Sequence, residues 1–301
     1  MKVGCAIWCF NPTGYKAPYD NALLEVVNAG FKGIEIIAGQ KEELDEYFTN
    51  TRIDDWKKVL DKNSVEVSEF VVFQDLIRGL SSFNKDEKNK ALECIEKGAK
   101  IAQRFGTKNV CIVSNYVEGL TPLTRVASQA IYTNVNGLQS PFNPKLYIGL
   151  PKGDFWDAAW ENYVASIKKC CQIVGAYGLN LAIEGHPNAI ISNADASLRL
   201  FEHVKEPNIG ENFDTTWHMV SREYVPMVIR KLKNRLLHLH VRDCDGLLSY
   251  GIPAGLGIID WEEVIESLKI INYNGFLSIE FGGEKYIKQS KKYLEDIIAE
   301  H

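Results

Sequence analysis

Residues 179–214 read LNLAIEGHPNAIISNADASLRLFEHVKEPNIGENFD, and this stretch contains one complete strand–helix–strand unit. The apolar runs Leu179–Glu184 and Ile209–Asp214 are short and continuous, as is typical of strands that are buried on both faces. The amphipathic stretch Ala194–Val204 between them predicts a helix that covers one of those faces. A unit of this kind joins two parallel strands.

The same alternation of strand and helix repeats along the whole chain, eight times in all. The predicted strands are Val3–Phe10, Gly33–Ala38, Glu66–Phe73, Asn109–Ser114, Leu179–Glu184, Ile209–Asp214, Leu236–Val241 and Phe276–Phe281. Eight units favour closure into a (β/α)₈ barrel over an open doubly wound sheet. The segment after the first strand, Cys9–Gly14, is no glycine-rich nucleotide loop. We therefore expect the α/β class and a single TIM-barrel domain over residues 1–301.

One connection is much longer than the others. Between Ser114 and Asp154 lie about forty residues without clear periodicity, and loops of such length in a compact domain are usually functional or disordered. The segment leaves the carboxyl end of the fourth strand, which is the active-site rim of a barrel. We interpret 114–154 as a long insertion loop that forms a lid, a substrate wall or a subunit contact, with a passive surface excursion as the alternative.

The composition excludes several classes of protein. The chain has 301 residues, of which 46% are hydrophobic and 24% charged, which is typical of a soluble globular protein. A formal net charge of −5 without a basic stripe argues against nucleic acid as a partner. No membrane span or signal peptide is visible. The seven cysteines show no CxxC spacing, so we expect reduced thiols and a cytoplasmic protein.

Four residues with metal-binding side chains stand at the carboxyl ends of the last four predicted strands: Glu184, Asp214, His240 and Glu280. Buried carboxylates are usually paired or bound to a metal, and Arg242 is the main basic residue in these strands. Three carboxylates and one imidazole suit Mn²⁺ best, with Mg²⁺ or Co²⁺ as alternatives. The sequence thus predicts one divalent metal ion, and buried salt bridges are the alternative.

The spacing of the histidines predicts where each of them points. Side chains two residues apart on a strand share a face, so His238 and His240 both point into the barrel. We expect His238 in a deeper layer, where it fills space or supports the metal ligands. His186 follows Glu184 by two residues and should rise above the metal, where it acts on substrate or orients the loop at Pro187.

Further residues are candidates for substrate binding. His218 is expected at the rim, hydrogen-bonded to a hydroxyl group while Trp217 covers an apolar ring face, or both pack within the loop. Arg242 clamps a polar substrate group or neutralises excess carboxylate. Phe73 and Gln74 end the third strand and are expected to contact substrate.

Two other acidic residues have structural explanations. Glu35 lies within the second predicted strand rather than clearly at its end. Asp260 precedes Trp261 at the start of a predicted helix, which is the position of an N-cap. We assign no chemistry to either residue.

Four motifs at strand ends resemble those of the sugar isomerase/epimerase superfamily with xylose isomerase-like barrels. They are Glu-Gly-His-Pro (184–187), Asn-Phe-Asp (212–214), His-Leu-His-Val-Arg-Asp (238–243) and Gly-Phe-Leu-Ser-Ile-Glu (275–280). The resemblance runs over nearly the whole chain. Each motif alone is weak, but all four in this order indicate the superfamily without indicating a substrate.

The resemblance implies a metal-dependent sugar isomerase or epimerase. The four predicted ligands would hold the metal, and Glu184 and Glu280 would also exchange protons with the sugar. Proton abstraction next to a carbonyl would proceed through a metal-stabilised enediolate. A carboxylate or His186 would remove the proton. Its return to the neighbouring carbon isomerises the sugar, and its return to the opposite face epimerises it.

Two features depart from the simple epimerase pattern. Ketose epimerases of the superfamily place a histidine three residues after the aspartate of the sixth strand, whereas His218 is the fourth residue after Asp214. The long loop after Ser114 is larger than a simple sugar epimerase needs. The loop and the motif Arg-Asp-Cys-Asp-Gly (242–246) together resemble features of the catalytic subunits of C-glycoside deglycosidases. In that alternative the chain is a lyase that acts on 3-oxo-glycosides, with His186 as base and a second, smaller subunit as partner.

Two further alternatives are remote. A DNA-repair endonuclease of the same barrel superfamily needs three zinc ions and many histidines, several of them on the first strands of the barrel. In this chain no histidine precedes His186. A non-catalytic sugar-binding barrel is the other alternative. We expect a small sugar or glycoside as the ligand and an oligomeric protein.

Overall fold

The computed structural model describes residues 1–120, 149–246, 251–281 and 284–301. Its strands are β1 Lys2–Ala6, β2 Gly33–Ala38, β3 Glu66–Val72, β4 Asn109–Val113, β5 Asn180–Glu184, β6 Ile209–Asp214, β7 Leu236–Val241 and β8 Phe276–Ile279. Its helices are α1 Asp20–Asn28, α2 Asn50–Lys62, α3 Gln74–Ile77, α4 Lys85–Phe105, α7 Trp156–Ala176, α8 Ala194–Val204, α9 Thr215–Val220, α10 Val225–Leu232, α11 Trp261–Ile270 and α12 Glu284–Glu300.

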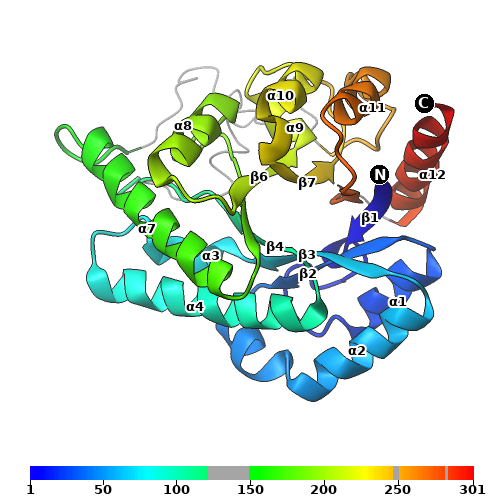
Figure 1. Ribbon diagram of the computed structural model, residues 1–301, viewed down its shortest axis with the longest axis horizontal. Coiled ribbons are helices and arrows are strands. Elements are labelled where there is room, and N and C mark those ends of the chain that lie inside the picture. Colours follow the sequence, from blue (N-terminus) through cyan, green and yellow to red (C-terminus); the bar gives the residue numbers. More distant parts are fainter. Residues whose placement is uncertain (121–148, 247–250, 282–283) are drawn as a thin grey trace, which may run out of the picture.

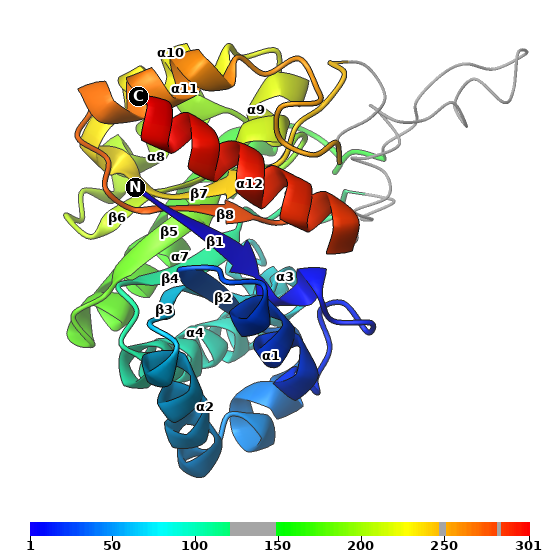
Figure 2. The ribbon, with the colours of Figure 1, turned by 90° about the vertical axis from the view of Figure 1, so that its right-hand side faces the viewer.

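The eight strands form a closed barrel in chain order, and β8 pairs in parallel with β1. Figure 1 shows the helices as a ring around the strands, with α12 next to β1. The view turned by 90° shows α12 beside β1 and β8, and the two termini close together (Figure 2). This architecture confirms the predicted TIM barrel, and it places the carboxyl ends of all eight strands on one face.

Some strands end earlier than predicted. The bounds of β2, β6 and β7 agree with the prediction, and nearly all of their residues are buried. The prediction that the first strand extends to Phe10 is wrong, because Ile7–Cys9 form a turn of 3₁₀ helix. The third strand stops at Val72, because Phe73 is the N-cap residue of the short helix α3.

Polar side chains and glycines set the ends of the covering helices. The Asn84 side chain accepts hydrogen bonds from the backbone N–H groups of Asp86 and Glu87 at the start of α4. Gly106 ends the same helix with a φ of 81°, a conformation that glycine adopts without strain. The Asp260 side chain accepts a hydrogen bond from the N–H of Glu263, which confirms the predicted N-cap of α11.

The register of the barrel brings the polar strand ends to the same height. Asp214 of β6 pairs with His240 of β7, and Glu184 of β5 pairs with Asn212 of β6. Glu280 directly follows β8. Since neighbouring parallel strands are about 4.8 Å apart, side chains at matched heights meet in the barrel mouth.

The long connection between β4 and α7 is described only at its two ends, residues 114–120 and 149–155. Residues 121–148 lie outside the described part, and with them most of the predicted lid, substrate wall or subunit contact. In the part of the chain that the structure describes, no helix has the length and apolar character needed to span a membrane.

The close contact between α4 and β3 gives a first prediction. A Cβ atom on the buried Gly98 would lie 2.4 Å from Val72 Cγ2, which is an overlap. We expect Gly98→Ala to lower the free energy of unfolding by about 1–3 kcal/mol, because overpacking outweighs the gain of about 1 kcal/mol in helix propensity. Urea unfolding monitored by circular dichroism measures the change. Lys100→Ala, on an exposed position of the same helix, serves as control, and equal stability of both variants would contradict the packing argument.

Candidate metal centre

Glu184, Asp214, His240 and Glu280 converge at the carboxyl ends of β5–β8, and we call them the outer cluster. One ligand atom from each residue lies within 4.8 Å of all the others, and all four side chains are buried. His240 Nδ1 is 3.6 Å from Glu184 Oε2 and 3.7 Å from Glu280 Oε2. The structure thus brings together all four residues that the sequence predicted to bind a metal.

Arg242 lies directly against the outer cluster. Its Nε donates to Asp214 Oδ2 over 2.8 Å, and its Nη2 contacts the same oxygen. Nη2 is also 3.3 Å from Glu280 Oε2. Of the two roles expected for Arg242, the structure shows neutralisation of the carboxylates, and the guanidinium also packs 4.4 Å from the centre of the Trp217 ring.

Asp214 is held in a fixed orientation by the start of α9. Its Oδ1 accepts hydrogen bonds of 2.8 Å from the backbone N–H groups of both Thr216 and Trp217. This N-cap directs Oδ2 towards Arg242 and the outer cluster. The motif Asn-Phe-Asp-Thr-Thr-Trp therefore encodes the orientation of one predicted ligand.

Burial and mutual charge shift the pKa values of the outer cluster. Burial raises the pKa of Glu280 to about 7, although the Arg242 guanidinium partly offsets this effect. Burial opposes ionisation of Glu184 as well, but the imidazoles of His240 and His186 hold its pKa well below the usual range. The pKa of His240 lies well above its ordinary value despite burial, because carboxylates surround the ring.

The residues present fit a divalent cation. Three carboxylates and one imidazole form a set of oxygen and nitrogen donors that suits Mn²⁺, Mg²⁺ or Co²⁺. Glu280 Oε2 is buried and has ion-pair contacts with Arg242 and His240, but it accepts no hydrogen bond from any described residue. Repulsion among three carboxylates at this separation also favours a bound cation.

His186 lies next to the outer cluster, in agreement with its spacing from Glu184. Its Nε2 is 3.2 Å from Glu184 Oε1, and its ring centre is 4.7 Å from that of Trp217. Trp217 thus packs between His186 and Arg242, two groups that contact the predicted ligands. The expected contact of Trp217 with an apolar face of a substrate is not tested by this packing.

His218 is buried between two carboxylates. Its Nε2 bonds Glu211 Oε1 over 2.8 Å, and its Nδ1 bonds Glu223 Oε2 over 2.7 Å. These two carboxylates raise the pKa of His218 to about 9 despite burial, and the ring stacks 4.1 Å from Phe213. Of the two roles expected for His218, this placement agrees with packing within the loop, because both of its ring nitrogens have partners in the protein.

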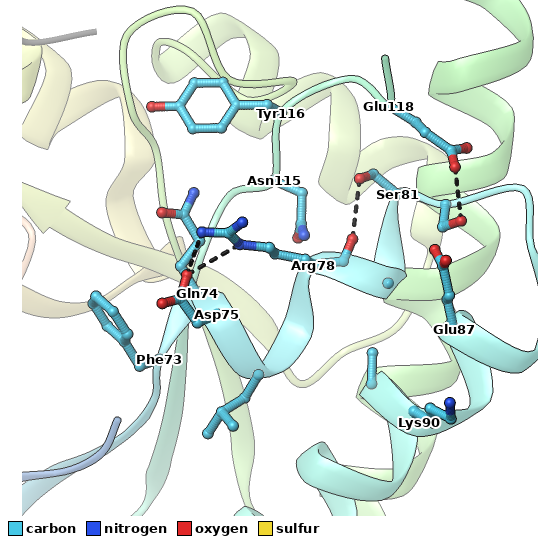
Figure 3. Close-up of a pocket in the computed structure, with 14 residues that line it drawn as sticks. Phe73, Gln74, Asp75, Arg78, Ser81, Glu87, Lys90, Asn115, Tyr116 and Glu118 are labelled. Atoms are coloured by element: carbon cyan, nitrogen blue, oxygen red, sulfur yellow. Dashed lines mark hydrogen bonds and ion pairs between the residues drawn. The ribbon is translucent and has the colours of Figure 1, made fainter. Parts of the chain in front are cut away.

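Phe73 and Gln74 line a cavity of about 600 Å³ next to the ends of β3 and β4. Figure 3 shows Tyr116, Asn115 and Arg78 around the same space, with Arg78 paired to Asp75. The cavity also has acidic and basic residues at its far side, Glu87, Lys90 and Glu118. The position of Phe73 and Gln74 is compatible with the expected contact to substrate.

Aromatic rings connect this cavity with the outer cluster. Phe73 stacks on Tyr15 at 4.7 Å, and Tyr15 in turn lies 5.7 Å from Trp8. The ring centres of Trp8 and His240 are 6.3 Å apart, and the two rings are nearly perpendicular. A continuous row of aromatic side chains therefore extends from the outer cluster to the cavity.

The sequence did not predict a second group of polar residues deeper in the barrel. Glu35, Glu69 and His238 lie below His240, and we call these three residues the inner cluster. Burial opposes ionisation of Glu35, but the imidazoles of His240 and His238 hold its pKa below the ordinary value. Burial raises the pKa of Glu69 to about 7. The available signal was a single acidic residue within each of two apolar runs, GIEII and SEFVV.

Curated relatives match parts of the chain. An uncharacterized protein of Methanocaldococcus jannaschii is 27% identical over 46% of this chain and 52% of its own length. An inosose dehydratase of Geobacillus thermodenitrificans is 22% identical over 48% of this chain and 54% of the relative. A fructoselysine 3-epimerase of Escherichia coli O157:H7 is 23% identical over 40% and 45%. The chain spans about half the length of the curated relatives it matches.

Solved structures share the fold over the whole chain. A D-psicose 3-epimerase with D-tagatose from Clostridium cellulolyticum H10 superposes with a TM-score of 0.75 at 18% identity, covering 100% of this chain and 99% of that one. An IOLI protein with a bound zinc atom superposes with a TM-score of 0.70 at 16% identity, over 100% and 99%. At these identities the superpositions establish the fold alone.

A family model described as the xylose isomerase-like TIM barrel matches residues 23–297. This match spans β2–β8 and therefore includes every residue of the outer cluster. The chain belongs to the xylose isomerase-like TIM barrel family.

Proposed function

We propose that this protein is a divalent-metal-dependent sugar isomerase or epimerase that removes a proton next to a carbonyl group and returns it to another position or face. The observation that carries this proposal is the outer cluster, in which three carboxylates and one imidazole from four consecutive strands lie within 4.8 Å of one another. Relatives that are named as epimerases and dehydratases of sugar-like compounds support an enzyme over a binding module.

Glu184, Asp214, His240 and Glu280 would hold the metal. A divalent cation at this position supplies Lewis acidity, which lowers the pKa of a C–H bond between a carbonyl and a hydroxyl group. Arg242 would balance the carboxylates that remain and would hold Asp214 in place through its two contacts to Oδ2. Side chains of the protein would then have to take one proton from the substrate and return it.

Glu184 and Glu280 are the proposed proton-exchanging groups, because both face His240 from different strands. Burial raises the pKa of Glu280 to about 7 in the absence of a cation, and a bound cation would favour its ionised form, which can accept a proton. His186 contacts Glu184 Oε1 over 3.2 Å and would accept or return a proton through that contact.

The proposed substrate contacts lie on the same face. Trp217 would shield the reacting atoms from water, since it is buried against His186 and Arg242. Phe73 and Gln74 would contact the part of the substrate that extends from the metal centre towards the cavity. A small sugar or glycoside therefore remains the proposed ligand.

A lyase reaction is the second candidate, and two observations favour it. Two of the relatives are named as dehydratases, an inosose dehydratase and a 3-dehydroshikimate dehydratase. The cavity of about 600 Å³ beside Phe73 also offers room for a bulky leaving group such as an aromatic aglycone. In this candidate, His186 is the base and a 3-oxo-glycoside is the substrate. Mn²⁺ as the ion, an oligomer, a smaller second subunit and a cytoplasmic location stay predictions.

Replacing one proposed ligand tests the reaction. We expect Glu280→Gln to lower kcat by at least about 10²-fold, because the amide cannot exchange a proton and binds the metal less well. The assay incubates ketoses in D₂O with Mn²⁺ and measures solvent deuterium in the product; 3-oxo-glycosides are tested in parallel for release of a free aglycone. Glu223→Gln, which changes a partner of His218 outside the cluster, is the matched control. Full activity of Glu280→Gln, or full activity after chelation, would refute the proposal.

Metal affinity should depend on pH in a defined direction. The raised pKa of Glu280 means that this carboxyl group binds a proton below about pH 7, and a proton there competes with the cation. We therefore expect the apparent Kd for Mn²⁺ to fall as the pH rises from about 6 to about 8, with release of protons on binding. Titration calorimetry in buffers of different ionisation enthalpy measures both effects. A Kd that is constant over this range would contradict competition between a proton and the cation at Glu280.

A further inference from the structure

The inner cluster lies inside the barrel, below the proposed catalytic centre. Glu35, Glu69 and His238 lie at central positions of β2, β3 and β7, whereas the outer cluster lies at strand ends. The exposed fraction of each side chain is 1% or less. One ligand atom from each of the three residues, together with one from His240, lies within 4.8 Å of all the others.

Glu69 is the unsatisfied member of the inner cluster. Both of its carboxylate oxygens are buried, and neither accepts a hydrogen bond from any residue in the described ranges. Glu35, by contrast, uses Oε1 for His238 Nε2 and Oε2 for His240 Nε2, the latter over 3.0 Å. An ionised carboxylate that is buried without a partner is strongly unfavourable, so a bound cation would stabilise the charged form of Glu69.

The strand register places the two acidic residues directly opposite each other. Ile34 pairs with Val67, but the next pair is Glu35 with Glu69, because an irregularity at this point skips one residue of β3. Like charges directly opposite on neighbouring strands repel each other. The irregularity therefore turns Glu69 towards Glu35 at a cost that a shared cation would offset.

The charges of the two clusters lead to the same conclusion. Five carboxylates (Glu35, Glu69, Glu184, Asp214 and Glu280) are buried in the two clusters, and Arg242 is the one permanently cationic side chain in contact with them among the described residues. Two divalent cations together with Arg242 would balance five ionised carboxylates. The neutral imidazole is the form that binds metals.

We propose that the inner cluster is a second metal site, in which Glu35, Glu69 and His238 bind a divalent cation beneath the outer cluster. Two carboxylates and one imidazole suit Mn²⁺ or Zn²⁺ more than Ca²⁺. Glu35 binds the cation through Oε1 and accepts the N–H of His240 Nε2 through Oε2. This hydrogen bond leaves His240 Nδ1 as the donor atom that faces Glu184 and Glu280, so the inner site positions a ligand of the outer one.

Metal stoichiometry tests the proposal on the full chain. The protein is stripped with a chelator, loaded with Mn²⁺ or Zn²⁺, desalted and analysed by mass spectrometry for metal per chain. We expect about two ions per chain in the wild type and about one in Glu69→Gln. Glu211→Gln, which changes another fully buried glutamate that belongs to neither cluster, serves as the matched control and should keep two ions. Circular dichroism verifies that each variant is folded.

Electron paramagnetic resonance of the Mn²⁺-loaded protein gives an independent measurement. Two ions in adjoining clusters should give a spin-coupled spectrum in the wild type, and Glu69→Gln should give the six-line spectrum of an isolated ion. A single ion in the wild type that Glu280→Gln removes and Glu69→Gln retains would overturn the inner site and leave the proposed function intact. A wild type that binds no ion would overturn both. If Glu69→Gln does not fold, the wild-type stoichiometry and spectrum still decide.

Discussion

Arg242 donates from two nitrogens to one oxygen of Asp214 in the buried mouth of the barrel, and this ion pair holds the surrounding site together. Removing either partner would leave an uncompensated charge in the barrel interior, which is more costly than the loss of a surface ion pair. The contact joins the end of β6 to the end of β7. Thr215 strengthens the junction, because its hydroxyl group donates to the Arg242 carbonyl over 2.6 Å.

The residue after Arg242 fixes the loop that follows β7. Asp243 is fully buried, and its carboxylate accepts hydrogen bonds from the backbone N–H groups of Cys244, Gly257 and Ile259 and from Trp261 Nε1. Arg242 contacts the metal centre, whereas Asp243 anchors the loop that leads to α11. One dipeptide thus serves both the charge balance of the site and the structure of its rim.

The clusters explain how the barrel stabilises many acidic side chains in its interior. The outer cluster relies on Arg242, His186 and His240, and each of these groups contacts at least one carboxylate. The inner cluster has two carboxylates opposite each other and shares His240 with the outer one. His240 therefore couples the two layers, because Nε2 faces Glu35 and Nδ1 faces Glu184. The occupancy of one layer is expected to influence the geometry of the other.

The sequence alone determined the barrel and the outer cluster. Short runs rich in apolar residues predicted the bounds of β2, β6 and β7, and a polar residue at the end of such a strand has to lie on the carboxyl face, where Glu184 and Asp214 are found. The tertiary structure alone decided how Glu35 and Glu69 meet, because a skipped residue in β3 sets their register and leaves no trace in the local pattern. It also decided that His218 pairs with Glu211 and Glu223, since the path of the chain after α9 determines which carboxylates reach the ring. Periodicity specifies the face on which a side chain lies, whereas its partners depend on register and on the packing of distant segments.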